Sequence, residues 1–321
     1  MAQPQPTITT TYAGEFAGEY ISAALLSGNT LANGLITVKP NVKFKSVLKT
    51  FATDTSSIAD ATCAFTDTAD ISLDEKILEP KEFQQNLILC KDQFQTDWEA
   101  VSMGYSAFDN LPPKFSDFLI AHASQQVAQF VEQKIWSGAA GAGSFQGFTS
   151  LLTADGTVND VTGTTVTAAN VIDELGKIVD AIPSTVYGMD DMYIYVSQNI
   201  ARAYIRALGG FGSIASNAGA NGVDNKGTMW YGMGENLAFD GVKLAVANGL
   251  ADNTAIAAQK SNLYFGTGLL ADHNLVKVID MADIDGSQQV RVVMRFTAGI
   301  RKIINTKNVK VSEVHLSQST N

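Results

Sequence analysis

An apolar stripe with helical spacing runs through residues 112–137, and it limits how this chain can fold more than any other feature. Its members recur every three or four residues, as on one face of a helix: Phe115, Leu119, Ala123, Val127, Phe130, Val131 and Ile135. Pro112 and Pro113 suit a first helical turn, and Gly138 suits the end of the helix. We therefore expect one continuous helix over 112–137 with Leu119, Val127, Phe130 and Ile135 buried. About 24 residues would make a rod of ~36 Å, which favours an elongated body.

Residues 41–100 are predicted to form a long β-ribbon. Residues 42–49 mostly alternate between apolar and polar, as in a strand with one solvated face, and residues 83–90 are strand-like as well. Two strands of about ten residues would project ~33 Å from the body. Because an isolated two-stranded ribbon is only marginally stable in water, we expect this one to lie across an adjacent subunit.

Charge is segregated along the expected ribbon. Its first strand is basic, with Lys39, Lys43, Lys45 and Lys49, and residues 54–75 carry six acids and no base. One interpretation is a pair of solvated faces. The other is docking between subunits, in which opposite charges supply register and specificity. For the second interpretation, the candidate contact residues are Lys43, Phe44, Lys45, Leu48, Lys49, Asp67 and Asp70.

The remaining segments predict an arm and an α+β body. Residues 1–40 resemble an arm, with an amphipathic turn and a half near Phe16 and Tyr20. Helices are expected at 167–182 and from Ser197 to 208, with a buried strand at 192–196 between them. Residues 209–234 contain eight glycines and are expected to form a long loop. Asp240-Gly241 and 285–287 are turn signals between further strands.

Composition supports a protein with partners. The arm, the ribbon and the long helix are not expected to bury their apolar faces within one subunit, which favours an assembly protein over a monomeric enzyme. Only 17% of residues are charged, against ~25% in typical domains, so other subunits could cover much of the surface. The net charge of −10 argues against free nucleic-acid binding, which depends on phosphate neutralisation. Two cysteines, no basic leader and no long apolar run predict a soluble, reduced, intracellular chain.

No catalytic, cofactor or metal site is expected. His122, His273 and His315 are far apart in the sequence and have no metal-ligand spacing. Residues 266–271 match G-x-G-x-x-A, but a dinucleotide fold needs a following helix, and the next segment is strand-like. We interpret this stretch as a tight strand connection. Residues 283–286 resemble half of a calcium loop, lack its other ligands and predict a turn.

The order of these parts resembles the HK97-fold major capsid protein of tailed double-stranded DNA bacteriophages. The resemblance covers nearly the whole chain. It rests on residues 12–15 and 20–25, 78–83 and 86–90 with Trp98, 135–138, 145–148, 239–242, 248–250 and 263–269. It implies an α+β fold with an N-arm at 1–40 and an E-loop at 41–100. It also implies a P-domain at 101–165 and 268–300, with the spine helix at 112–137, and an A-domain at 166–267 and 301–321.

The resemblance further implies a structural, non-enzymatic shell subunit that forms hexamers and pentamers around packaged DNA. Its partners would be further copies, a portal protein and accessory capsid proteins, with DNA held by non-specific proximity. It would occur in the virion, and in the host cytoplasm during assembly, without membrane or cofactor. The glycine-rich loop would lie at the centre of each capsomer. Two alternatives stay open: an encapsulin-like nanocompartment shell and a nucleotide-dependent enzyme, the latter resting on Gly266.

Overall fold

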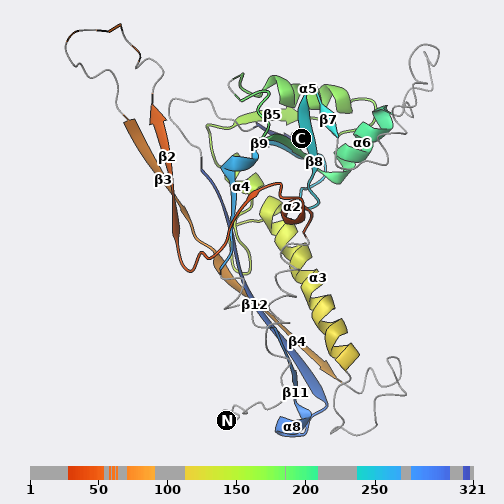
Figure 1. Cartoon of the computed structure of the whole chain (residues 1–321). Helices are drawn as coiled ribbons and strands as arrows, with labels where there is room; N and C mark the ends of the chain where they lie inside the picture. The colour runs from red at the N-terminus through yellow and green to blue at the C-terminus, as the bar shows by residue number, and fades with distance from the viewer. Residues whose placement is uncertain are drawn as a thin grey trace.

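The computed structural model describes residues 28–53, 58, 60–61, 63, 71–90, 113–184, 186–208, 237–268, 276–303 and 314–318. The expected arm helix near Phe16 and the glycine-rich loop 209–234 lie outside these residues. The described chain is elongated (Figure 1). A sheet with helices forms one end, a long helix and long strands extend from it, and a separate ribbon projects to one side.

The long helix is present as α3, Pro113–Ser137, and it runs without a break. Val127 and Ile135 of its stripe are buried, and Phe130 is half-buried; the side chain of Leu119 lies outside the description. Phe130 packs edge-on against Phe83 at a centroid distance of 5.5 Å. The stripe is therefore covered by the same chain, which corrects the expectation that the helix needs a neighbour to bury it.

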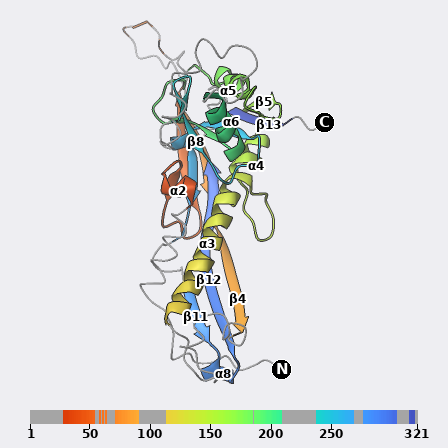
Figure 2. The same ribbon diagram turned by 90° about the vertical axis from the view of Figure 1, so that its right-hand side faces the viewer.

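The long helix lies along a five-stranded sheet built around β12, Gln289–Lys302 (Figure 2). β12 pairs antiparallel with β4 (Lys81–Cys90), β11 (Val276–Asp280) and β10 (Leu263–Gly266). β1 (Thr37–Lys39) pairs parallel with β10. The expected turn at 285–287 follows a single helical turn, α8 (Ala282–Asp285), which ends at Gly286 with φ of 71°. With 14 residues, β12 makes the sheet long enough to run alongside α3.

The ribbon has a different second strand from the one predicted. β2, Ser46–Thr53, pairs with β3, Ile71–Leu78, whereas the segment 83–90 belongs to β4 and pairs with β12. Alternate β4 side chains, including Phe83, Leu87 and Leu89, pack against the core under α3, and this burial outweighs pairing with β2. Cys90 consequently lies opposite Gln289 in the long sheet, and Cys63 is exposed and free.

A six-stranded sheet forms the other end of the molecule, in the order β5-β13-β9-β6-β8-β7. Its strands are β5 (Asn159–Gly163), β6 (Met192–Val196), β7 (Ala238–Phe239), β8 (Val242–Val246), β9 (Ala255–Gln259) and β13 (Val314–Gln318). Helices α5 (Val171–Asp180) and α6 (Gln198–Leu208) share its apolar cluster. The predicted hairpin is present, with positive φ at Asp240 and Gly241 between β7 and β8.

The two sheets divide the chain at other positions than the expected domain ranges. β5 lies within 101–165 but joins the six-stranded sheet. β10 lies within 166–267, and β1 within 1–40, yet both join the long sheet. β1, β5 and β10 pair with strands that are remote in the sequence. The local sequence pattern therefore does not reveal which sheet each of them joins.

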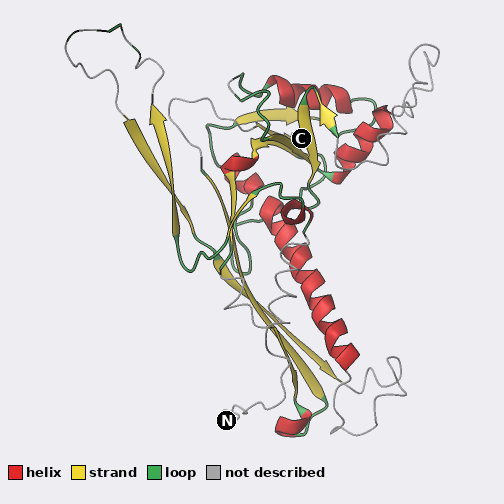
Figure 3. Ribbon diagram, viewed as in Figure 1, coloured by secondary structure: helices red, strands yellow, loops and turns green. Residues whose placement is uncertain are grey.

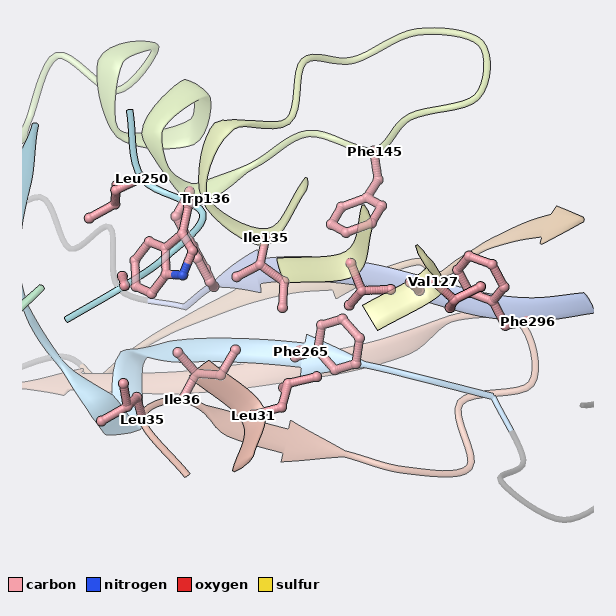
Figure 4. Close-up of a cluster of buried hydrophobic side chains, with 14 of the residues drawn as sticks. Leu31, Leu35, Ile36, Val127, Ile135, Trp136, Phe145, Leu250, Phe265 and Phe296 are labelled. Carbon is pink, nitrogen blue, oxygen red and sulfur yellow. The ribbon is translucent and has the colours of Figure 1, made fainter. Parts of the chain in front are cut away.

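The two ends of the molecule meet at Trp136, in the last turn of α3. Its buried ring lies 4.9 Å from that of Tyr195 in β6 and 5.6 Å from that of Phe148, the first residue of α4 (Phe148–Thr153). Figure 4 shows Trp136 beside Ile135 and Leu250 in this cluster. The Tyr195 hydroxyl donates to the Leu35 carbonyl at 2.6 Å. One apolar cluster therefore joins both sheets and the helix into a continuous core.

A buried polar network holds the segment 28–36 on the same turn. The Glu132 carboxylate accepts the Thr30 N–H at 3.0 Å and the Thr30 hydroxyl at 2.5 Å. The Trp136 indole N–H donates to the same hydroxyl at 2.7 Å. Thr30 is the second residue of the short helix α2, Asn29–Ala32. Because every member of this network is hydrogen-bonded, the cost of burying these polar groups is compensated.

A buried ion pair ties the end of β12 to the loop after α4. The Lys302 Nζ lies 2.9 Å from Asp155 Oδ2, with both side chains largely buried. Burial alone would raise the pKa of Asp155. Hydrogen bonds from Thr157 and Lys302, together with the Lys302 charge, outweigh burial and hold that pKa well below its usual range. The ionised pair is therefore the stable form in the folded chain.

We expect Trp136→Ala to lower the free energy of unfolding by ~3–5 kcal/mol, because a large buried ring is removed at the junction. Urea unfolding followed by circular dichroism measures this. Gln129→Ala, at an exposed position of the same helix, should stay within ~0.5 kcal/mol of the unmodified chain. Equal effects of the two substitutions would contradict the junction described above.

We expect Asp155→Asn to destabilise the chain at neutral pH by ~3–5 kcal/mol, because Lys302 stays buried without this carboxylate. The folded-state pKa of Asp155 is depressed, so its contribution is complete above the unfolded pKa near ~4 and declines as pH falls toward the folded value. Unfolding measured from pH 7 to pH 3 should therefore show a flatter acid limb for this variant. Asp252→Asn, at an exposed aspartate, is the matched control.

Candidate functional site

The ribbon of β2 and β3 exposes several large apolar side chains, and we take it as the candidate functional site. Figure 3 shows its two strands standing apart from the other sheets. The register pairs Val47 with Ile77, Lys49 with Glu75 and Phe51 with Leu73 along one face. Leu48, Thr50 and their partners Lys76 and Asp74 alternate onto the opposite face. The two faces therefore have different chemistry.

The first face presents apolar side chains to solvent. Val47, Leu73 and Ile77 are 46%, 48% and 49% exposed. The pair Lys49–Glu75, with Nζ and Oε1 3.3 Å apart, lies between the two apolar pairs. We call the side chains Val47, Leu73 and Ile77 the ribbon patch. Cross-strand pairs stabilise the hairpin, but they leave about half of each side chain uncovered.

The base of the ribbon is buried on the opposite face. Leu48 and Leu78 form a cluster with Val42, and Tyr264 and Ile303 of the long-sheet region pack against it. Leu78 is fully buried. The base is therefore part of the folded body, and Ile77 of the ribbon patch borders a cavity against that body, lined also by Phe145 and Ile300.

Apart from Leu48, the predicted contact residues divide into three groups. Lys43 and Phe44 are exposed, Phe44 to 73%, and the Lys45 Nζ lies 5.5 Å from the Phe44 ring centroid. Lys45 and Lys49 each lie 3.3 Å from a carboxylate of their own hairpin, Glu79 and Glu75. Asp67 and Asp70 lie outside the described residues.

The contacts of these residues within the single chain are as follows. Lys45 and Lys49 reach carboxylates of their own hairpin, because the register places β3 and the residue after it opposite the basic strand. Leu48, expected to contact a neighbour, is buried in its own chain. Lys43 and Phe44, also named from sequence, are exposed and lie just before β2.

The sequence interpretation missed Val47, Leu73 and Ile77. Residues 71–75 lie within the acidic block 54–75, although Leu73 and Ile77 share one side of a strand. Their alternation is a sufficient signal for a strand. Residues 83–90 offer a longer apolar run, which favours them in the sequence as the partner of the first strand.

The residues considered for catalysis or metal binding do not gather in the described chain. His122 on α3 contacts Gln126, with 3.0 Å between Nε2 atoms, and His315 lies in β13; His273 is outside the description. Within the described ranges no group of three or more His, Cys, Asp or Glu side chains could hold a metal ion. Gly266 ends β10, and the next described element is the strand β11.

Among the described helices, none combines the length and apolar character that crossing a bilayer requires.

Comparison with known proteins identifies the fold. No protein-family model matches the sequence, and no curated protein matches it. A capsid chain of a native GTA particle aligns with 100% of this chain and 96% of its own, with a TM-score of 0.58 and 15% identity. A chain of Mycobacterium phage Cain aligns with 92% of this chain and 91% of its own, with a TM-score of 0.59 and 11% identity. The capsid of Myoviridae phage XM1 aligns with 99% of this chain and 97% of its own, with a TM-score of 0.55 and 11% identity.

These similarities span both sheets, the long helix and the ribbon, since coverage is nearly complete. The chain therefore has the mixed α+β fold of phage capsid proteins, as the resemblance implied. At such low identities the likeness concerns the fold, and the role of the ribbon has to be argued from its own chemistry.

We expect Leu48→Ala to lower the stability of the isolated chain by ~2–5 kcal/mol, because it leaves a cavity at the ribbon base. Phe44→Ala should stay within ~0.5 kcal/mol, because that ring is mostly exposed. Denaturant unfolding, together with amide exchange of β2 and β3, measures both. A larger loss for Phe44→Ala than for Leu48→Ala would contradict the assignment of the base.

Proposed function

We propose that this chain, which has the fold of phage capsid proteins, is the major structural subunit of an icosahedral phage head. In this role it self-assembles into hexamers and pentamers that enclose double-stranded DNA. The observation that carries the proposal is the extent of the likeness. The three solved chains compared above match at least 91% of their own length to at least 92% of this one, so no large part is left for another role.

The ribbon supplies an independent physical argument for assembly. A two-stranded ribbon needs a third surface for stability in water, and the ribbon patch is half uncovered in the single chain. Burying the exposed halves of Val47, Leu73 and Ile77 would stabilise a contact by ~1 kcal/mol each. We propose that the patch lies on a neighbouring subunit, and that this contact repeats around every capsomer.

Charge has a smaller part in this proposal than the sequence indicated. Lys45 and Lys49 are already paired within the hairpin, and all four partners are about half exposed. Exposed pairs contribute ~0.2–1 kcal/mol each, so exchanging one carboxylate for another gains little. We infer that apolar burial drives docking, and that Lys43, with Asp67 and Asp70, adjusts its register.

The named domains follow from the same proposal. β2 and β3 would be the E-loop within 41–100, and α3 would be the spine helix of a P-domain at 101–165 and 268–300. The N-arm would occupy 1–40, and the A-domain 166–267 and 301–321, with the sheet exchanges described above. A portal protein and accessory capsid proteins are the further partners this role requires, in the virion and in the host cytoplasm during assembly.

The test of the proposal is assembly of the purified chain. We expect closed shells of uniform size by negative-stain electron microscopy, with capsomers resolved as sixfold and fivefold rings. A chain that stays monomeric at all concentrations and salt conditions would contradict the function.

A variant in the ribbon patch tests the contact itself. We expect Ile77→Ser to raise the concentration needed for assembly about fivefold, which corresponds to ~1 kcal/mol per contact. Its unfolding free energy should change little, because the side chain is half exposed. Lys76→Ser, the adjacent residue on the opposite face, is the matched control. Equal assembly of the two variants would remove the ribbon patch from the interface.

A further inference from the structure

The ribbon leaves the body where β12 changes partners. β4 pairs with β12 as far as Lys81 opposite Ala298, and the pairing of β10 with β12 starts at the next residue of β12, with Gly266 opposite Gly299. Figure 1 shows the ribbon diverging from β12 at this level. The strand ends of β3 and β4 are joined here by Glu79 and Pro80. The direction of the ribbon is therefore decided at this point.

Two glycines facing each other across the sheet create the space for the ribbon base. A Cβ at Gly266 would lie 2.8 Å from Leu78 Cδ2, and a Cβ at Gly299 would lie 2.8 Å from Pro80 Cα and 2.9 Å from the Glu79 oxygen. Both distances are shorter than side-chain contacts allow. Gly266 and Gly299 thus form a recess, the glycine socket, that Leu78 and Pro80 fill.

The lack of space for a side chain, and not the backbone conformation, explains why glycine stands at both positions. Neither has φ in the left-handed region, so alanine could adopt both backbone conformations. The obstacles differ in kind. At Gly266 the obstructing atoms are the end of the Leu78 side chain, whereas at Gly299 they are backbone atoms of Glu79 and Pro80. An added methyl group can displace a side-chain end locally, but it can only displace backbone by moving the ribbon.

The segment that leads from β1 into β2 is held at the level of the glycine socket. The Val42 N–H donates to the Thr267 carbonyl at 3.0 Å, and the Thr267 N–H donates to the Lys39 carbonyl at 3.2 Å. Leu48 and Leu78 are buried beside Val42. Close-packed interiors transmit displacement rather than absorb it, so a change in the socket would tilt the whole ribbon.

We propose that Gly266 and Gly299 are positioning residues that set the angle between the ribbon and the long sheet. Because the ribbon would rest on a neighbouring subunit, this angle also sets the tilt between subunits and hence the curvature of the shell. The second step rests on the proposed function, whereas the first concerns the single chain.

The first step is tested by a distance measurement in the monomer. Spin labels at Asp74→Cys on β3 and Gln129→Cys on α3, in a Cys63→Ser, Cys90→Ser background, report the ribbon direction. Asp74 lies four residues beyond Leu78, a lever of ~13 Å. We expect Gly299→Ala to shift the mean distance by several ångströms and Gly266→Ala to shift it less. Gly176→Ala, where an added Cβ meets no atom within 4 Å, should leave it unchanged.

A suppressor variant separates tilt from general damage. Adding Leu78→Ala to Gly266→Ala should restore the original distance, because the clash is with that side chain. Adding it to Gly299→Ala should not, because the clash there is with backbone. Unchanged distances in both glycine variants, or restoration in both, would overturn the socket. If Gly299→Ala fails to fold, the test of the socket rests on Gly266→Ala measured with and without Leu78→Ala.

The second step is read from particles. We expect Gly299→Ala to give shells of altered diameter or open tubes, with Gly176→Ala giving the original particles. A shifted monomer distance with unchanged shell diameter would overturn the link to curvature while leaving the positioning role. If the unmodified chain forms no shells, the proposed function fails and the curvature step with it, but the monomer distances still decide the socket.

Discussion

The contact between the apolar stripe of α3 and the long sheet is the interaction on which the rest of the structure depends. Val127 and Ile135 are buried against residues of β12 and β10, and Phe130 is packed between Phe83 and Phe296. At its last turn the same helix presents Trp136 to the six-stranded sheet and Glu132 to Thr30. One helix therefore fixes both sheets and the segment 28–36 in a single body.

The ribbon follows the opposite principle, because only its base belongs to that body. Leu48 and Leu78 are buried, yet the next side chains along the ribbon remain about half exposed. Its lysines are satisfied by carboxylates of the same hairpin. What the ribbon lacks is apolar cover, which a neighbouring subunit would supply under the proposed function. Its direction is then as important as its chemistry, which gives the glycine socket its proposed role.

Prediction from sequence succeeded for elements whose pattern is local. The stripe of α3, the strand at 192–196 and the Asp240-Gly241 hairpin each depend on residues within one segment, and all three are present. Prediction failed for the ribbon partner. The error arises from pairing: residues 71–78 and 83–90 are each competent strands, and the sequence does not state which one meets β2.

The sequence by itself determined the helix, most strands and the α+β class, because the periodicity of apolar residues reflects which side chains must leave water. It also determined that a ribbon would exist. Only the tertiary structure decided that β4 serves the long sheet, that Lys45 and Lys49 are paired internally, and that Gly266 faces Gly299. Those facts depend on contacts between residues far apart in the chain. The free energy of such contacts comes from burial and register in three dimensions, which no local pattern records.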